Sequence, residues 1–188
     1  KCKSIDNFVA INVESGIGAG IFIGGTIYCG FSGSAGEIGH LIVQKNGRLC
    51  GCGNHGCLET YASTRYMLLE VNNRLNSGYS SNSIQKSNKP LKWDRIVEAA
   101  ENGDPLCSEV LHQAAKYLGH AMAFLINTLN PEAIVLGKSF TQYASLVMGT
   151  LTRTVKEKAL NYPASRVKIM TSDFGMNSSA LGAAMIPI

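Results

Sequence analysis

The segment between residues 37 and 59 carries histidine and cysteine residues at spacings that suit a single metal ion. The candidate ligands are His40, Cys50, Cys52 and Cys57. One imidazole and three thiolates complete the tetrahedral shell of Zn²⁺ and leave no position open for a water molecule, which is typical of a structural zinc site. The glycines between these cysteines allow a chain to fold back on one ion. The spacing therefore predicts a zinc ion that shapes the loop and takes no part in a reaction.

Two other readings of these cysteines are disulfide bonds and ordinary buried thiols. Cys50 and Cys52 are too close in sequence to bridge each other easily, and six cysteines in 188 residues are too few for a disulfide scaffold. His55 lies between Cys52 and Cys57 and could compete as a ligand. Because the four candidates already fill the shell, we expect His55 to lie beside the site or in solvent.

The composition indicates that this chain can bury a hydrophobic core. Of its 188 residues, 45% are hydrophobic and 16% are charged, with a net charge of +4, so we expect one domain or one lobe of a larger protein. The basic cluster from Lys86 to Lys92 is interrupted by polar residues and proline, which is more typical of a solvated loop than of a nucleic-acid surface. No apolar run reaches the roughly 18 residues of a membrane span. Free thiols and zinc ligands favour the cytoplasm.

Hydrophobic periodicity predicts the strands and helices that must position the loop of candidate metal ligands. Alternating, β-branched residues predict a meander of strands over Phe8–Val13, Gly20–Ile23 and Thr26–Cys29. A short strand is expected at Leu41–Val43, inside the loop, and a helix from Cys57 or Leu58 to Leu75. The loop thus connects a β-meander to a helix.

The second half of the chain alternates helices with strands. Asp104 and Pro105 predict the start of a long core helix that Asn130-Pro131 ends. The other expected elements are helices over 93–102, 140–160 and 178–185 and strands over 133–136 and 167–171. This alternation predicts an α/β fold with a mixed sheet. Residues 76–92 offer almost nothing to a core, and we expect them to form a mobile insertion.

With these residues in view, the chain resembles the ROK family of repressors, unassigned reading frames and sugar kinases. The matching segments are Ser15–Gly20, Ala35–His40, the Cys50, Cys52, Cys57 and Glu59 run, Leu129–Gly137, and Ala180–Ala184. They are spread over nearly the whole chain. The resemblance implies a lobe of the actin-like ATPase or ribonuclease H-like fold that contributes to a sugar cleft. It also implies that residues 1–188 form a single C-terminal lobe, without the family's N-terminal lobe and any DNA-binding domain.

The resemblance places sugar contacts at Glu37, His40 and Glu59. The chemistry agrees, because ionised carboxylates accept hydrogen bonds from two sugar hydroxyls each. His40 can bind zinc through one ring nitrogen while the other faces a hydroxyl or a carboxylate. The alternative is that Glu37 is an ordinary loop carboxylate and that Glu59 favours a helix start through the helix dipole.

A weaker resemblance concerns nucleotide binding. In the family's kinases a glycine-rich turn approaches phosphate, and the matching positions here are Ser15, Gly16, Gly18 and Gly137. A turn of this kind is as often only a hairpin connection. Glu14 beside the turn would repel a polyphosphate, and Lys138 to Phe140 follow Gly137 where kinases continue with glycine. ATP and Mg²⁺ are therefore expected only if the chain is part of a kinase.

Three functions remain open from the sequence. The first is the effector-binding lobe of a sugar-responsive transcriptional regulator, which would contact DNA only through a domain outside this chain. The second is half of an ATP-dependent hexose or N-acetylhexosamine kinase, whose general base would lie in the missing lobe. The third is a zinc-stabilised scaffold with a decayed sugar site. The expected ligand is a sugar or sugar phosphate, and the family resemblance implies a homo-oligomer.

Overall fold

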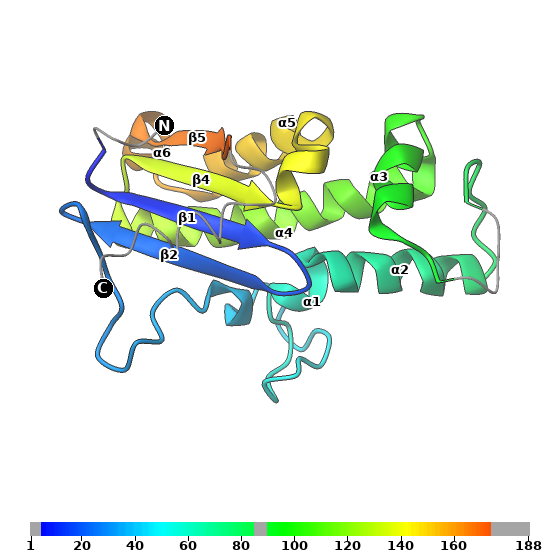
Figure 1. The fold of residues 1–188 in the computed structure, drawn as a ribbon, viewed down its shortest axis with the longest axis horizontal. Helices are drawn as coiled ribbons and strands as arrows, with labels where there is room; N and C mark the ends of the chain where they lie inside the picture. Colours follow the sequence, from blue (N-terminus) through cyan, green and yellow to red (C-terminus); the bar gives the residue numbers. More distant parts are fainter. Residues whose placement is uncertain (1–4, 85–89, 174–188) are drawn as a thin grey trace.

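The computed structural model describes residues 5–84 and 90–173, which build a five-stranded sheet with helices against it (Figure 1). The strand order is β3-β2-β1-β4-β5. The strands are β1 (Phe8–Val13), β2 (Ile17–Ile23), β3 (Thr26–Ile27), β4 (Ala133–Lys138) and β5 (Lys168–Thr171). β1 pairs antiparallel with β2 and parallel with β4, and β4 pairs parallel with β5. The predicted α/β fold with a mixed sheet is confirmed.

The core lies on one face of this sheet. Val9, Ile11 and Val13 alternate along β1 and are almost fully buried, because the long helices α4 (Pro105–Leu129) and α5 (Phe140–Lys158) cover that face (Figure 1). Alternation with a period of two is what a strand needs to present one apolar face. The expected central helix is therefore confirmed as α4, the longest element of the described chain.

The predicted start and end of α4 are also confirmed. The Asp104 side chain accepts a hydrogen bond from the Cys107 amide at 3.0 Å, Pro105 follows it, and Asn130 ends the helix in the left-handed region at φ 45°. The other carboxylate oxygen of Asp104 accepts hydrogen bonds from Ser81 Oγ and the Asn82 amide, both at 2.7 Å. The helix cap therefore also holds the loop that precedes residue 85.

Part of the segment 76–92 packs against the core, and its mobility stays a prediction. Ile84 is 8% exposed and belongs to the core cluster, and Leu91 is partly buried against that cluster. Its polar composition hid this role, because the anchoring hydrogen bonds come from Asp104, a residue distant in sequence. Residues 85–89 and the predicted helix over 178–185 lie outside the described residues.

Several predicted elements differ from the structure. β2 begins three residues before the predicted strand Gly20–Ile23, and β3 ends two residues before Cys29. The helix expected from residue 57 or 58 to 75 is two helices, α1 (Glu59–Ala62) and α2 (Thr64–Asn76), because Ser63 is extended and caps α2 through the Tyr66 amide. The strand expected over 41–43 is only an isolated bridge from Ile42 to Cys57. The helix expected to reach residue 160 ends at 158, and a short helix, α6 (Asn161–Arg166), follows.

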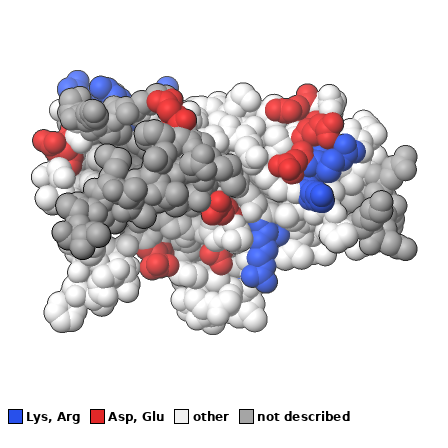
Figure 2. All heavy atoms as spheres, viewed as in Figure 1, with Lys and Arg blue, Asp and Glu red and all other residues white. Residues whose placement is uncertain are grey.

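The remaining elements of the described residues are α3 (Trp93–Glu101), as predicted to within one residue, and the 3-10 turn η1 (Ile38–His40). Acidic and basic side chains are interspersed on the face drawn in Figure 2, in line with the scattered charge of the sequence. Within residues 5–84 and 90–173, the helices are too short or too polar to cross a membrane.

Candidate metal centre and sugar site

The metal loop, residues 38–57, begins at η1 and closes on itself before α1. The amide of Leu58 donates a hydrogen bond to the carbonyl of Leu41 at 2.8 Å, and Ile42 forms an antiparallel bridge with Cys57. Leu49 and His55 form a second bridge nearer the tip. These contacts bring the two ends of the loop side by side although the intervening chain is long. Backbone hydrogen bonds therefore close the loop independently of a metal ion.

The four predicted ligands converge inside this loop. The potential ligand atoms of His40, Cys50, Cys52 and Cys57 all lie within 4.8 Å of one another. His40 Nδ1 lies 3.6 Å from Cys50 Sγ, and Cys52 Sγ lies 3.7 Å from Cys57 Sγ. The cysteine sulfurs carry no disulfide bond. The predicted cluster is therefore present as a possible zinc site.

The spacing of the ligand atoms fits a tetrahedral zinc ion. With Zn–S near ~2.3 Å and Zn–N near ~2.0 Å, tetrahedral geometry sets adjacent sulfurs ~3.8 Å apart and a sulfur and a nitrogen ~3.5 Å apart. The observed separations of 3.7 Å between Cys52 Sγ and Cys57 Sγ and 3.6 Å between His40 Nδ1 and Cys50 Sγ match these values. Sulfur and imidazole ligands at these distances suit Zn²⁺ better than Mg²⁺ or Ca²⁺, which prefer oxygen ligands.

The pKa values of two of the thiols are shifted in opposite directions. Burial, with smaller contributions from the neighbouring Cys52 and Cys50, raises the pKa of Cys57 to about 12. The amide of Asn54 lowers the pKa of Cys52 by donating a hydrogen bond to its sulfur. Because thiolates are the zinc-binding form, a divalent ion bound here would compensate for the negative charge of the thiolates.

Gly56 shows why the loop needs glycine. Its φ is +84°, and a Cβ atom built there would lie 1.8 Å from the carbonyl oxygen of Gln44. A side chain would therefore push the strand-like ends of the loop apart next to Cys57. The sequence argument for a tightly folded loop is confirmed at this position.

His55 lies outside the ligand cluster. It is exposed, and its Nδ1 lies 3.0 Å from the carbonyl oxygen of Gly47, to which it donates a hydrogen bond in the matching tautomer. This is the position expected from the sequence, where three cysteines and His40 leave no room for a fifth ligand.

Arg48 attaches the metal loop to the helices behind it. Its guanidinium donates to the Thr60 carbonyl at 2.9 Å, forms an ion pair with Glu70 of α2, and lies over the ring of Tyr61 at 4.8 Å from the centroid. Its own amide donates to the Tyr61 hydroxyl at 2.9 Å. Glu70 is held in turn by Arg74 at 2.6 Å. One side chain thus connects the loop, α1 and α2.

We expect Arg48→Ala to loosen the metal loop without unfolding the protein. The side chain is partly exposed, so the free energy of unfolding should fall by only about 1 kcal/mol, while zinc should dissociate several-fold faster because the loop opens more often. Zinc release to a chromogenic chelator, followed with time, measures this. The exposed Arg95→Ala is the control, and equal release rates for both variants would contradict the assignment.

Glu37 and His40 share the first turn of the loop. His40 Nε2, the ring nitrogen that points away from the cysteines, lies 3.9 Å from Glu37 Oε2. The Glu37 side chain is 68% exposed, so its carboxylate faces solvent. A metal on Nδ1 would fix the ring and leave Nε2–H free to donate to a carboxylate or to a ligand hydroxyl.

Glu59 lies against the same point of the sheet as this turn. Its Oε2 accepts a hydrogen bond from the Ile17 amide at 3.4 Å, and a Cβ atom on Gly39 would lie 2.4 Å from the Ile17 carbonyl oxygen. The start of α1 and the turn that bears His40 therefore meet at the first residue of β2. Two of the predicted sugar residues, His40 and Glu59, belong to the two segments that meet here, and Glu37 Oε2 lies 3.9 Å from His40 Nε2.

The predicted nucleotide residues fall into two groups. Ser15 and Gly16 form the turn between β1 and β2, where a Cβ atom on Gly16 would lie 2.8 Å from Glu59 Oε2. Gly18 and Gly137 both pair with Asn12, one on each side of β1. The turn is thus next to the sugar residues, and the two strand glycines form a row across the sheet.

Sequence reasoning missed Ile17, Arg48 and Tyr61 as supports of the site. Ile17 acts through its backbone, which leaves no side-chain signal. Arg48 and Tyr61 act through contacts between the loop and the helices, and their spacing matches no local motif.

A mixed sheet of this order, with a His/Cys₃ loop after its first hairpin, defines a lobe of the actin-like ATPase fold. The ROK family model matches residues 1–188, and the chain belongs to the ROK family.

Named relatives include repressors and kinases. The chain is 31% identical over 186 residues to the xylose repressor of Bacillus subtilis and 34% identical over 181 residues to the transcriptional dual regulator NagC of Escherichia coli. It matches the crystal structure of a ROK family transcriptional regulator, a homologue of the E. coli MLC protein, with a TM-score of 0.87, 35% identity and 97% of this chain covered. A glucokinase from Streptomyces griseus, in complex with glucose and AMPPNP, matches with a TM-score of 0.85, 26% identity and 98% coverage.

The chain covers only part of these relatives. Its match spans 45% of the xylose repressor, 44% of NagC, 46% of the regulator structure and 61% of the glucokinase. The activities and partners of the whole proteins therefore lie beyond what these matches establish for this chain.

Proposed function

We propose that the chain is the effector-binding lobe of a cytoplasmic ROK transcriptional regulator, in which a structural zinc ion orders a sugar site. The single observation that carries this proposal is the convergence of the Glu37–His40 turn and Glu59 at Ile17, directly beside the four metal ligands. Zinc held by His40 and the cysteines would fix the turn, and the two carboxylates would accept sugar hydroxyls.

Relatives and residues favour a regulator over a kinase. The two repressor relatives and the regulator structure share 31 to 35% identity with this chain, whereas the glucokinase shares 26%. Glu14 lies at the β1–β2 turn, with its carbonyl accepting a hydrogen bond from the Thr64 amide at 2.7 Å. Its carboxylate beside that turn would oppose a polyphosphate. DNA would be bound by a separate domain, with the sugar shifting the balance between two arrangements of the protein.

Calorimetric titration of the full-length protein tests the proposal. The panel is glucose, xylose, N-acetylglucosamine and their phosphates, chosen because the relatives are named for such sugars. We expect one sugar class to bind, with affinity lost after zinc is removed by a chelator. Absence of binding by every sugar in the zinc-loaded protein would refute a sugar-responsive role.

The kinase remains the second candidate because of the glucokinase match and the Gly18–Asn12–Gly137 row across the sheet. A coupled assay for ADP with ATP, Mg²⁺ and each sugar separates the two. The regulator predicts sugar binding without turnover, and sugar-dependent ADP release by the full-length protein would establish the kinase instead.

A further inference from the structure

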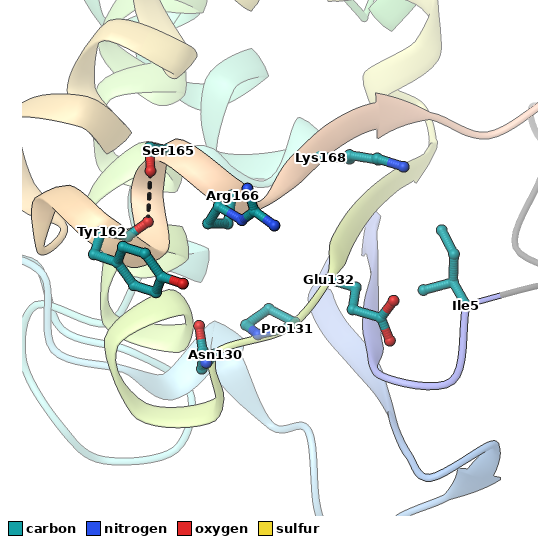
Figure 3. Close-up of a pocket in the computed structure, with 8 residues that line it drawn as sticks. All are labelled: Ile5, Asn130, Pro131, Glu132, Tyr162, Ser165, Arg166 and Lys168. Carbon is teal, nitrogen blue, oxygen red and sulfur yellow. Dashed lines mark hydrogen bonds between the residues drawn. The ribbon is translucent and has the colours of Figure 1, made fainter.

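A hollow of about 520 Å³ lies at the end of the sheet opposite the β1–β2 turn (Figure 3). We call it the α6 hollow, and its polar lining is Asn130, Glu132, Tyr162, Ser165, Arg166 and Lys168. It lies where the parallel strands β4 and β5 begin, whereas Glu59 lies by the turn that follows the end of β1. The proposed sugar site and the α6 hollow are therefore separate places on the lobe. The volume is within the range of small-molecule pockets.

Three walls build the α6 hollow. Tyr162, Ser165 and Arg166 lie three and four residues apart on α6 and so share one face of that helix. The turn from Asn130 to Glu132 joins α4 to β4 and forms the second wall, and Lys168 opens β5 as the third (Figure 3).

Three side chains of the hollow, two of them cationic, have hydrogen-bond donors without a partner among the described residues. Among the described residues, no hydrogen bond or ion pair engages the side chains of Tyr162, Arg166 or Lys168. Ser165, by contrast, donates its hydroxyl to the Tyr162 carbonyl at 2.8 Å, which stabilises the helix turn. A guanidinium, an ammonium and a phenol thus line one concave surface, and none of them has a side-chain partner within residues 5–84 and 90–173.

The single carboxylate in the hollow is fixed. Glu132 Oε1 accepts hydrogen bonds from the Asn7 amide and from Asn7 Nδ2, both at 3.2 Å. These donors hold the carboxylate next to the start of β1, while Oε2 can still accept a hydrogen bond from a hydroxyl. Two cations against one engaged carboxylate leave the hollow net positive.

We propose that the α6 hollow binds a small phosphate monoester of a polyhydroxylated molecule, such as a sugar phosphate. The guanidinium of Arg166 offers a planar fork that suits phosphate oxygens, and Lys168 adds a second charge. The exposed ring of Tyr162 suits the apolar face of a sugar, and Glu132 and Asn130 accept hydroxyls. Two cations in one concavity match a single phosphate better than the repeated phosphates of a nucleic acid.

Calorimetry on the full-length protein tests the α6 hollow with glucose 6-phosphate, inorganic phosphate and glucose as probes. We expect glucose 6-phosphate to bind more tightly than inorganic phosphate, and Arg166→Gln or Lys168→Gln to weaken its binding by about tenfold or more. Arg153→Gln is the matched control, because Arg153 is an exposed cation on α5, 66% exposed, away from the hollow. It should leave the affinity unchanged.

A Glu59→Gln background distinguishes this site from the proposed sugar site. Glucose 6-phosphate should retain a binding event that depends on Arg166 in that background, whether or not the sugar site functions. Loss of all glucose 6-phosphate binding in Glu59→Gln, or equal affinities for Arg166→Gln and Arg153→Gln, would overturn the proposal. Tighter Arg166-dependent binding of a short DNA duplex than of glucose 6-phosphate would also overturn it.

Discussion

Replacement of Cys57 by serine in the full-length protein is expected to reduce bound zinc from one ion per chain to well below one. Cys57 is fully buried, its sulfur lies 3.7 Å from that of Cys52, and it ends the loop where the chain enters α1. A serine hydroxyl is a poor zinc ligand at neutral pH, so the affinity for zinc should fall by roughly 100-fold or more. Elemental analysis after dialysis measures the stoichiometry.

Cys107→Ser is the matched control for this substitution. Cys107 is equally buried, on α4, and does not belong to the ligand cluster. Both variants place a hydroxyl in a buried site, so both should lose some stability, but only Cys57→Ser should lose zinc. Full zinc occupancy in Cys57→Ser would show that the cluster is not the metal site.

Loss of zinc should disorder the metal loop and leave the sheet and long helices folded. The loop contributes few side chains to the core, which is built from the strands, α4 and α5. Far-ultraviolet circular dichroism should therefore change little, whereas amide hydrogen exchange within residues 38–57 should accelerate. Faster exchange throughout β1 and α4 would instead show that the ion supports the whole lobe.

The elements that the sequence predicted well are those governed by local rules. Asp104 and Pro105 start α4 because a capping carboxylate and a proline act on their immediate neighbours. The metal ligands converge because cysteines separated by glycines can reach one ion only in a closed loop. In both cases the information lies within a short stretch of chain.

The elements that were missed depend on contacts between distant residues. The helix expected to begin near residue 57 breaks at Ser63 because the Thr64 amide donates to the Glu14 carbonyl at 2.7 Å, outside the helix. Arg48 reaches Thr60 and Glu70, and no periodic pattern relates these positions. Hydrophobic spacing reports which face is buried, but not which distant backbone groups replace helical hydrogen bonds.

The α6 hollow illustrates the same limit. Its residues come from 130–132 and 162–168. Residues 130–132 belong to a segment that resembles the ROK family, but nothing in that segment pointed to a hollow shared with 162–168, and α6 itself was not expected from the sequence. The parallel pairing of β4 with β5 brings the two segments together, since Ala133 lies opposite Lys168. A site of this kind becomes visible only once the strand order is known.

Glu59→Gln is expected to weaken sugar binding to the full-length protein by about 10- to 100-fold while leaving its fold intact. The amide keeps the size of the side chain and can still accept the Ile17 amide hydrogen bond. It loses the negative charge and one acceptor, which hydrogen bonds to sugar hydroxyls require in their stronger, charge-assisted form. Isothermal titration with the sugar that binds the unmodified protein measures the change.

Glu101→Gln provides the comparison, because Glu101 is an exposed glutamate at the end of α3, remote from the metal loop. Zinc content and melting temperature should match the unmodified protein in both variants. Glu59→Gln should differ only in sugar affinity, since its carboxylate borders the metal cluster without belonging to it. Unchanged affinity in Glu59→Gln would leave the zinc loop as a purely structural feature and move the sugar site elsewhere. An affinity that falls together with the zinc content would mean that Glu59 acts by supporting the loop.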